Sequence, residues 1–347
     1  MSRRLRVSCT AYSEPIRAQN RSTMSFRILS IDGGGIRGII PALILAELEQ
    51  RAGRPVAKMF DLVAGTSTGG ILAVGLTMPG ARRKPKYSAL DLVSLYEENG
   101  DEIFHRSKWH RIRAIGNLAE EKYPSDGIDR VLGERFGDTW LSAVLTNVLV
   151  TAYDIELRRP HFFKSDRARK RPERDFHLAD VARATSAAPT YFEPAQVSSR
   201  AGGDPVALVD GGVYANNPAA CALVEALCTY GATLSDMTFL SLGTGELTRP
   251  ILHEEAKGWG LAKWAQPILS VVFDGVSDTV DFQVKSILEL AADAPNSYLR
   301  IQAPLHEGND DMDDASRTNI KVLKLLAKDL LATHSDAIDE MVERLTR

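Results

Sequence analysis

Long apolar runs are absent from this sequence of 347 residues. No stretch approaches the ~18 consecutive apolar residues that a membrane-spanning helix needs. Residues 1–24 are basic and polar, and their apolar stretch is too short for the core of a secretory signal peptide. We therefore expect residues 1–24 to be a disordered basic leader and the protein to act in the cytoplasm.

Cysteine is scarce, with only Cys9, Cys221 and Cys228 in the chain. The number is odd and the spacing matches no common metal-binding pattern, which favours reduced thiols and a reducing compartment. Cys221 and Cys228 lie seven positions apart in an expected helix, so we interpret them as small hydrophobic residues on one face.

A strong excess of either charge is also missing, since 42 Lys and Arg residues stand against 45 Asp and Glu residues. The net charge of −3 creates no global basic field, so a nucleic acid polymer is not an expected partner. The hydrophobic fraction of 44% and the charged fraction of 25% are ordinary for a globular protein. A chain of this length can bury a large core without disulfides or structural metals.

Alternating strand and helix patterns predict an α/β fold. Residues 26–31 (FRILSI) and 60–64 (FDLVA) indicate buried strands, and each precedes a glycine-rich turn and a helical pattern, at 39–50 and from Gly70. This repetition is typical of parallel βαβ packing. Further strands are expected at 145–153, 162–163, 206–209, 237–242 and 298–301, and further helices at 89–100, 126–136, 177–188, 218–228 and beyond 258.

A G-x-S-x-G motif occupies residues 65–69, between an expected strand and an expected helix. That context is the one a nucleophile elbow requires, because Gly65 and Gly69 permit a sharp turn and a close approach of strand and helix. The turn would lift the Ser67 hydroxyl above the sheet edge, next to a positive helix N-terminus. Many glycine-rich turns match this motif by chance, so its context carries the prediction that Ser67 is a nucleophile.

A second glycine-rich turn, DGGGIRG, occupies residues 32–38. Backbone N–H groups that glycines expose at a helix start form an anion site, which in an acyl hydrolase is the oxyanion hole. The predicted members of this hole are Gly33, Gly34, Gly35, Arg37 and Gly38. The alternative is a phosphate loop, because residues 33–38 also satisfy G-x-G-x-x-G, although the G-K-[ST] of a P-loop is absent.

A third motif, Asp210-Gly211-Gly212, follows the expected strand 206–209. An aspartate at the carboxyl end of a strand, freed by Gly211 and Gly212, can face the same crevice as Ser67. A free aspartate is a poor base at its pKa of about 3.9. Desolvation would raise that pKa, and a hydrogen bond to Ser67 would supply the geometry of a general base. Taken alone, D-G-G more often marks a simple turn.

In this order, the three motifs resemble the signature of patatin-like phospholipases, as do residues 184–194, 216–218 and 274–283. The resemblance covers residues 26–330. It implies a three-layer α/β/α fold with a mostly parallel central sheet and a helical C-terminal portion. We accordingly expect one domain at 25–347, with a catalytic core at 26–245 and a helical portion at 255–347.

The resemblance also implies the activity. It predicts a Ser67–Asp210 dyad without histidine that cleaves acyl esters of membrane glycerolipids through an acyl-enzyme, without calcium or another cofactor. The protein would then act peripherally at the inner membrane surface. Some bacterial relatives degrade membranes in anti-phage defence when a cyclic dinucleotide activates them, so such an activator is a candidate partner. The alternative from another class is a non-catalytic phosphate- or nucleotide-binding module that uses DGGGIRG.

The sequence offers two further candidate sites. A Ser–Asp–His triad would need a histidine after Asp210, and the candidates His253, His306 and His334 lie in no glycine-flanked strand-end turn. The acidic run at 309–314 could suggest calcium, but it lacks the glycine and distal glutamate of an EF-hand loop. Its aspartates better fit capping of a helix from Ser316 onward.

Two surface segments allow two interpretations each. The basic stretch at 158–174 fits a solvated loop, or a surface that attracts anionic lipid headgroups or an anionic regulator. Residues 259–273 carry two tryptophans on an apolar segment, which either packs on the core or forms an interfacial, lid-like surface.

Overall fold

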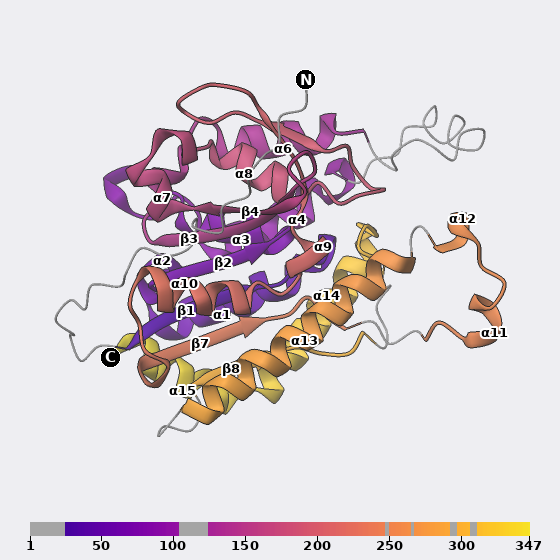
Figure 1. The fold of residues 1–347 in the computed structure, drawn as a ribbon. Helices are drawn as coiled ribbons and strands as arrows, with labels where there is room; N and C mark the ends of the chain where they lie inside the picture. The colour runs from indigo at the N-terminus through magenta and orange to yellow at the C-terminus, as the bar shows by residue number, and fades with distance from the viewer. Residues whose placement is uncertain (1–24, 104–123, 247–249, 265–266, 292–296, 306–310) are drawn as a thin grey trace.

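The computed structural model describes residues 25–103, 124–246, 250–264, 267–291, 297–305 and 311–347 (Figure 1). Its centre is an eight-stranded sheet in the order β5-β6-β3-β2-β1-β7-β8, with β4 paired to β3. The strands are β1 (Phe26–Ile31), β2 (Leu62–Thr66), β3 (Asn147–Asp154), β4 (Arg159–Lys164), β5 (Ala195–Val197), β6 (Val206–Asp210), β7 (Met237–Leu242) and β8 (Tyr298–Ile301). Five neighbouring strands, β3-β2-β1-β7-β8, run parallel, whereas β4, β5 and β6 pair antiparallel.

Helices cover both faces of the sheet, which confirms the predicted three-layer α/β/α fold. Figure 1 shows α10 (Ala219–Thr229) and α13 (Pro267–Ala291) across the near face. The larger core joins the sheet to α1 (Ile39–Ala52), α3 (Thr68–Thr77), α4 (Ala89–Ile103), α6 (Asp126–Phe136), α8 (Leu178–Thr185), α14 (Arg317–Thr333) and α15 (Ser335–Thr346). Shorter helices are α2 (Val56–Met59), α7 (Ser165–Lys170), α9 (Gly212–Ala215), α11 (His253–Ala256) and α12 (Leu261–Trp264). Within the described ranges, no helix is both long and apolar enough to cross a membrane.

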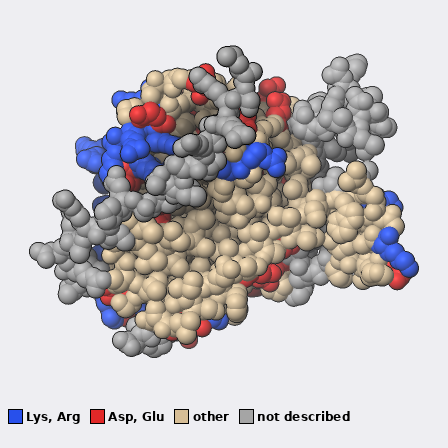
Figure 2. Space-filling view, viewed as in Figure 1, with Lys and Arg blue, Asp and Glu red and all other residues tan. Residues whose placement is uncertain are grey.

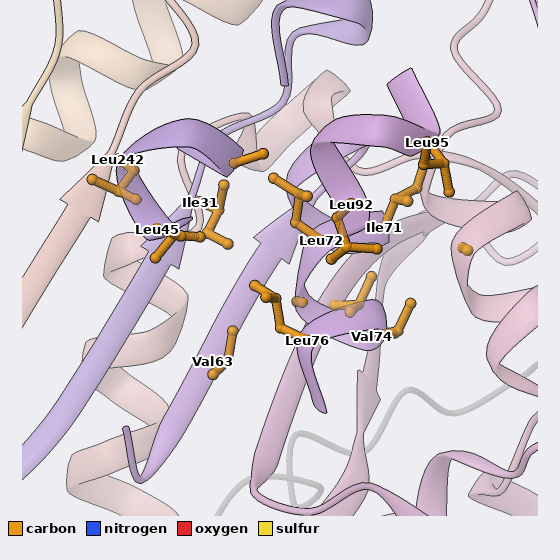
Figure 3. Packing of buried hydrophobic residues seen from close by; sticks show 14 of the residues in the cluster. Ile31, Leu45, Val63, Ile71, Leu72, Val74, Leu76, Leu92, Leu95 and Leu242 are labelled. Atoms are coloured by element: carbon orange, nitrogen blue, oxygen red, sulfur yellow. The ribbon is translucent and has the colours of Figure 1, made fainter. Parts of the chain in front are cut away.

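Side chains of the parallel strands alternate between two hydrophobic cores. On β1, Ile28 belongs to the core under α10 and α13, whereas Leu29 and Ile31 belong to the larger core on the other face. Successive strand residues point to opposite faces, so both sets are buried only because helices cover both sides. In Figure 3, Val63 of β2 and Leu76 of α3 lie among the packed side chains of the larger core.

The second strand and the helix after it differ from the expected boundaries. β2 begins at Leu62 rather than at residue 60, because the Phe60 N–H still bonds back to the Val56 carbonyl at the end of α2. The strand then continues through Thr66, which pairs with Thr151 of β3. The helix α3 starts at Thr68, so strand and helix meet at the single residue between them.

The basic stretch at 158–174 is not a loop, which corrects the first of its two interpretations. It forms β4, α7 and a turn of 3₁₀ helix at Pro172–Arg174. The reason is its apolar alternation: His161 and Phe163 are buried, and Phe163 packs edge to face on Phe176 with ring centroids 5.1 Å apart. These contacts anchor the strand. Lys164 pairs with the buried Glu225, whereas the other Lys and Arg residues of the stretch are exposed.

The C-terminal portion completes the same sheet and core. β8 extends the sheet beside β7, and α14 and α15 pack against α1. The Ser316 hydroxyl caps α14 by accepting the Asn319 N–H at 3.2 Å, so the cap is Ser316 itself rather than the preceding aspartates. Asn309 and Asp310 of the acidic run, and the leader at 1–24, lie outside the described residues.

The packing of α15 predicts how much its buried residues contribute to the free energy of unfolding. Leu345 is fully buried near the end of the chain, and its carbonyl accepts a hydrogen bond from Arg27. We expect Leu345→Ala to lower the free energy of unfolding by about 2–5 kcal/mol, because it removes buried methyl groups and leaves a cavity. Urea denaturation measures this, and Leu325→Ala, at a position 59% exposed, should change it by no more than about 0.5 kcal/mol. Equal losses of stability in Leu345→Ala and Leu325→Ala would contradict the burial of Leu345.

Candidate active site

Ser67 sits in a strained turn between β2 and α3. Its φ of 54° and ψ of −124° lie in a region that non-glycine residues rarely adopt. The two motif glycines make this turn feasible, because a Cβ at Gly65 would collide with the backbone of Gly69, and a Cβ at Gly69 with the carbonyl oxygen of Ile31. The chain therefore turns sharply at Ser67, with strand and helix in close approach.

Hydrogen bonds from neighbouring elements hold the strained residue. The Ser67 N–H donates to Thr185 Oγ1 at 2.8 Å, and that hydroxyl donates to the Thr151 carbonyl at 2.7 Å. Thr66 Oγ1 donates to the Ala215 carbonyl at 2.6 Å. The turn is thereby tied to α8, β3 and α9, which lets the surrounding structure sustain the unfavourable backbone conformation.

The sheet topology brings Asp210 to Ser67. One edge of β3 pairs with β4 along residues 149–154, so β2 and β6 share its other edge. β2 ends where Thr66 meets Thr151, and β6, running in the opposite direction, ends where Asp210 meets Ala152. The carboxyl ends of the two strands therefore face each other along one edge.

The Asp210 carboxyl is buried and only partly hydrogen-bonded. Its Oδ1 accepts the Gly212 N–H at 2.7 Å, while its Oδ2 has no partner at full hydrogen-bonding distance among the described residues. Burial raises the pKa of Asp210 to about 7, and the adjacent Ser67 hydroxyl opposes that rise. A carboxyl with this pKa can exchange a proton with a neighbouring hydroxyl near neutral pH.

The Asp210 turn depends on its two glycines. A Cβ at Gly211 would collide with Thr151, and one at Gly212 would press on the ring of Phe273 and on Asp210 itself. These close approaches let the Gly212 N–H reach the carboxylate, so both glycines serve the turn as the motif predicts.

The glycine loop leaves two peptide N–H groups free. The Gly33 N–H donates to the Asn216 carbonyl at 3.0 Å, the Ile36 N–H to the Met312 carbonyl at 2.9 Å and the Arg37 N–H to the Gly34 carbonyl at 3.2 Å. Within the described part of the chain, the N–H groups of Gly34 and Gly35 have no acceptor. Both glycines line the same pocket as Ser67. Of the five predicted members of the oxyanion hole, Gly34 and Gly35 are therefore the ones that combine a free N–H group with a place in the pocket lining.

The remaining predicted members of the loop support it from behind. Arg37 is buried and its Nε donates to the Gly34 carbonyl at 3.2 Å. Burial lowers the pKa of Arg37, and the negative charge of Asp274 on α13 opposes this. Gly38 lies against Thr68, where a Cβ would collide with the threonine hydroxyl. Arg37 therefore braces the loop, and Gly38 lets it approach the elbow.

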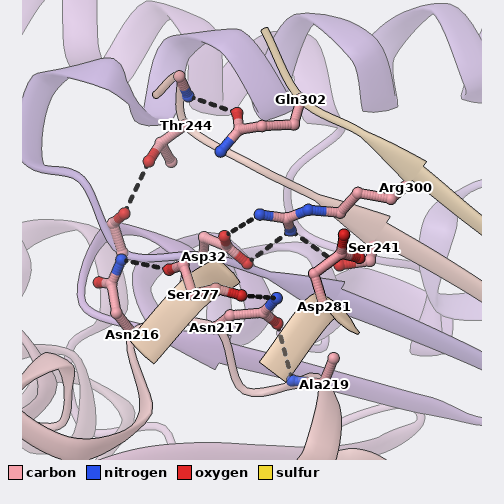
Figure 4. A network of polar contacts seen from close by, with 12 residues as sticks. Asp32, Asn216, Asn217, Ala219, Ser241, Thr244, Ser277, Asp281, Arg300 and Gln302 are labelled. Atoms are coloured by element: carbon pink, nitrogen blue, oxygen red, sulfur yellow. Dashed lines mark hydrogen bonds and ion pairs between the residues drawn. The ribbon is translucent and has the colours of Figure 1, made fainter. Parts of the chain in front are cut away.

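An ion pair holds the start of the loop. Arg300 of β8 contacts both carboxylate oxygens of the buried Asp32, at 3.0 and 2.6 Å, and donates to Ser241 Oγ at 2.9 Å (Figure 4). On the other side of the loop, Thr244 Oγ1 donates to the Gly33 carbonyl at 2.7 Å. Sequence reasoning missed Arg300, because 268 positions separate it from Asp32 and no motif surrounds it.

Ser67 and Asp210 open on an apolar pocket with about 640 Å³ of space, including the part that is open to solvent. Its apolar lining includes Ile71, Tyr96, Ile103, Ile128, Phe192 and Phe273. These residues come from five segments of the chain, so the sequence alone gave no sign that they surround one space. The pocket suits a hydrocarbon chain rather than a phosphate group.

Histidine does not line this pocket in the described part of the chain. His253 is exposed on α11, and His334 lies between α14 and α15, where its Nδ1 contacts the Leu330 carbonyl. His306 lies outside the described residues. The structure therefore brings neither described candidate of the alternative triad to Ser67.

Comparison with known proteins identifies the family. The model of the family described as "Patatin-like phospholipase" matches residues 29–223, more than half of the chain. The chain belongs to the patatin-like phospholipase family. Members of this family are lipid acyl hydrolases, and the chain is accordingly a carboxylic ester hydrolase. The family assignment favours the hydrolase over the alternative of a non-catalytic phosphate-binding module.

Several plant relatives match this patatin-like protein over most of its length. "Patatin-like protein 4" of Arabidopsis thaliana is 35% identical over 88% of this chain and 83% of the relative. "Patatin-T5" of Solanum tuberosum is 34% identical over the same shares, 88% and 83%. Among solved structures, VipD from Legionella pneumophila aligns with 88% of this chain and 67% of its own at 13% identity, with a TM-score of 0.34.

The buried pair between Asp32 and Arg300 predicts a distinctive mutational pattern. Arg300→Met leaves an unpaired carboxylate in the protein interior, so we expect a loss of about 3–5 kcal/mol in the free energy of unfolding. The double variant Asp32→Asn with Arg300→Met should recover most of that loss, because neither charge then remains buried. Urea denaturation measures both variants, and a double variant no more stable than Arg300→Met would contradict the pairing.

Proposed function

We propose that this patatin-like protein hydrolyses acyl esters of membrane glycerolipids through a Ser67–Asp210 dyad. The observation that carries the proposal is the placement of a buried carboxyl, with a pKa near 7, beside a strained serine at the mouth of an apolar pocket. The pocket would hold the acyl chain and direct its ester carbonyl toward Ser67.

In the first half of the reaction, Asp210 accepts the Ser67 proton while Oγ attacks the ester carbonyl carbon. The tetrahedral intermediate collapses to an acyl-enzyme, and the lysolipid alkoxide leaves with the proton from Asp210. In the second half, Asp210 accepts a proton from water as the hydroxide attacks the acyl-enzyme. The fatty acid then departs, and the proton returns to Ser67.

We infer that Gly34 and Gly35 form the oxyanion hole. Their N–H groups are free and line the pocket beside Ser67. Neighbouring segments clamp the loop, since a Cβ at Gly34 would collide with Thr244 and one at Gly35 with the Met312 carbonyl. Donors fixed in advance need little reorganisation as the oxyanion forms, and each contributes roughly 10²–10³-fold to the rate.

Gating by a cyclic dinucleotide, a role in antiviral defence and action at the inner face of a membrane remain predictions from the resemblance to bacterial relatives. None of the contacts described above favours them. Phospholipid hydrolysis measured with and without added cyclic dinucleotides tests the activator, and equal rates across the panel would count against it.

The dyad predicts which side chains are indispensable. We expect Ser67→Ala and Asp210→Asn each to lower ester hydrolysis by roughly 10³-fold or more, because each removes one partner of the proton transfer. The measurement is fatty acid release from phospholipid vesicles together with hydrolysis of a soluble p-nitrophenyl ester. Both variants should keep a native unfolding transition.

A matched control comes from Ser186, which lines the same pocket but donates its hydroxyl to the Ala182 carbonyl at 2.7 Å. Ser186→Ala should retain most of the activity. A fluorophosphonate probe should label Ser67 in the wild-type protein and leave Ser67→Ala unlabelled. Turnover near the wild-type rate in Ser67→Ala or Asp210→Asn would refute the dyad.

The raised pKa of Asp210 predicts the pH dependence. The base must be ionised to accept the Ser67 proton, so kcat/KM should increase with pH through a single ionisation centred near the Asp210 pKa of about 7 and then level off. Initial rates on a soluble ester across the acidic and neutral range measure this profile. A rate that is already constant well below neutral pH would contradict a buried carboxyl as the base.

A further inference from the structure

Exposed hydrophobic residues concentrate in one part of the chain. Among the described residues, thirteen large hydrophobic side chains are exposed, and eight of them fall between residues 251 and 290. An even distribution would place only about two in a segment of that length, so this stretch departs from the scattered apolar exposure of an ordinary surface.

The first part of this segment carries what we call the apolar edge: the exposed Leu252, Leu261, Ile268 and Val271 together with the half-buried Trp259 and Trp264. Leu261 is 94% exposed and Leu252 53%. Trp259 and Trp264 pack edge to face on each other, with ring centroids 5.1 Å apart. In Figure 1 the helices α11 and α12 project from the body of the molecule at the right.

The last two residues of the apolar edge, Ile268 and Val271, lie on the helix α13 that also lines the pocket. Phe273 lies on α13, just beyond Val271, and lines the pocket with Ser67 and Asp210. At a rise of 1.5 Å per residue, Ile268 lies about 8 Å from Phe273 along the helix axis. The inner face of α13 also holds a neighbour of the glycine loop: Ser277 Oγ accepts a hydrogen bond from Asn216 at 3.0 Å, and the Asn216 carbonyl accepts the Gly33 N–H (Figure 4).

We propose that the apolar edge inserts into a lipid bilayer and brings the pocket mouth to the membrane surface; this rests on the proposed lipid hydrolysis at Ser67. The charges of the projecting segment balance, since Glu254 and Glu255 accompany Lys257 and Lys263, all of them exposed. Tryptophan and leucine side chains favour the membrane interface, and insertion through them requires no anionic lipid.

The basic helix α7 is a competing place for a membrane, but its position is unsuited to presenting the pocket. Arg169 on α7 contacts Asn147 and the Val144 carbonyl at the start of β3. Ser67 lies at the opposite end of the parallel strands. Figure 2 shows blue side chains gathered over the α7 end, while the projecting end at the right is mostly tan. Docking through α7 would turn the pocket away from the lipid.

Vesicle binding tests the proposal in the Ser67→Ala background, which removes turnover. We expect the full chain to co-sediment with phosphatidylcholine vesicles and to remain bound at high salt, because charge screening does not weaken apolar insertion. Replacing Leu252 and Leu261 together by Asp should weaken this binding by about tenfold or more. Leu325→Asp, a matched control at a position 59% exposed on α14, should bind like the parent.

Hydrolysis of a soluble ester and of vesicle lipid, measured side by side, distinguishes a failure of membrane binding from a failure of the proposed hydrolysis. With Ser67 intact, the Leu252→Asp/Leu261→Asp variant should hydrolyse a soluble short-chain ester at the parental rate and lose hydrolysis of vesicle lipid. If both proteins hydrolyse the soluble ester but the parent does not bind vesicles, the membrane proposal fails and the dyad stands. If vesicles bind but neither ester nor lipid is cleaved, the proposed function fails instead.

Tryptophan fluorescence provides a second measurement, on a protein in which no residue of the apolar edge is substituted. Brominated phosphatidylcholine should quench the emission of the Ser67→Ala protein, and Trp259→Phe/Trp264→Phe should remove most of that quenching. Absence of quenching, or undiminished vesicle binding by Leu252→Asp/Leu261→Asp, would overturn the proposal. A wild-type dimer that these Asp substitutions dissociate, without vesicle binding, would also overturn it and assign the apolar edge to a second copy of the chain.

Discussion

The buried ion pair between Asp32 and Arg300 is the constraint on which the active site depends. It fastens the start of the glycine loop to β8, while the Asn216 carbonyl and Thr244 hold Gly33 and the Met312 carbonyl holds Ile36. Between these fixed points, Gly34 and Gly35 line the pocket with N–H groups that have no acceptor among the described residues. A loop braced from several segments can keep donors aimed at a site before any charge develops there.

One physical cause gives the site two properties. The apolar residues around the pocket withdraw Asp210 from water, and the same residues offer a surface that hydrocarbon chains prefer. Desolvation raises the carboxyl pKa because it disfavours the charged form. A lipid chain in the pocket would exclude further water, so substrate binding would raise the pKa of the Asp210 carboxyl further.

Helix α13 connects the interior of the site with the surface. Its inner face supplies Phe273 to the pocket and Ser277 to Asn216, beside the glycine loop. Its outer face and the preceding segment carry the exposed residues of the apolar edge. Because one helix carries both faces, the proposed membrane-binding residues and the residues that surround Ser67 are held at a fixed distance from each other.

The sequence by itself determined the strands at 26–31, 237–242 and 298–301 and the three turns at 32–38, 65–69 and 210–212, because apolar periodicity and glycine spacing are local properties of a chain. The three-layer fold followed from the resemblance of these motifs to a known family. The sequence also placed Ser67 and Asp210 at strand ends, where the sheet brings them together. Only the tertiary structure selected Gly34 and Gly35 among the loop amides, paired Asp32 with Arg300, assembled the pocket and extended the short strand expected at 162–163 into β4 and α7. The contacts of Asp32 with Arg300 and of Gly33 with Thr244 join residues more than 200 positions apart, and no local pattern encodes which distant partner will satisfy a given polar group.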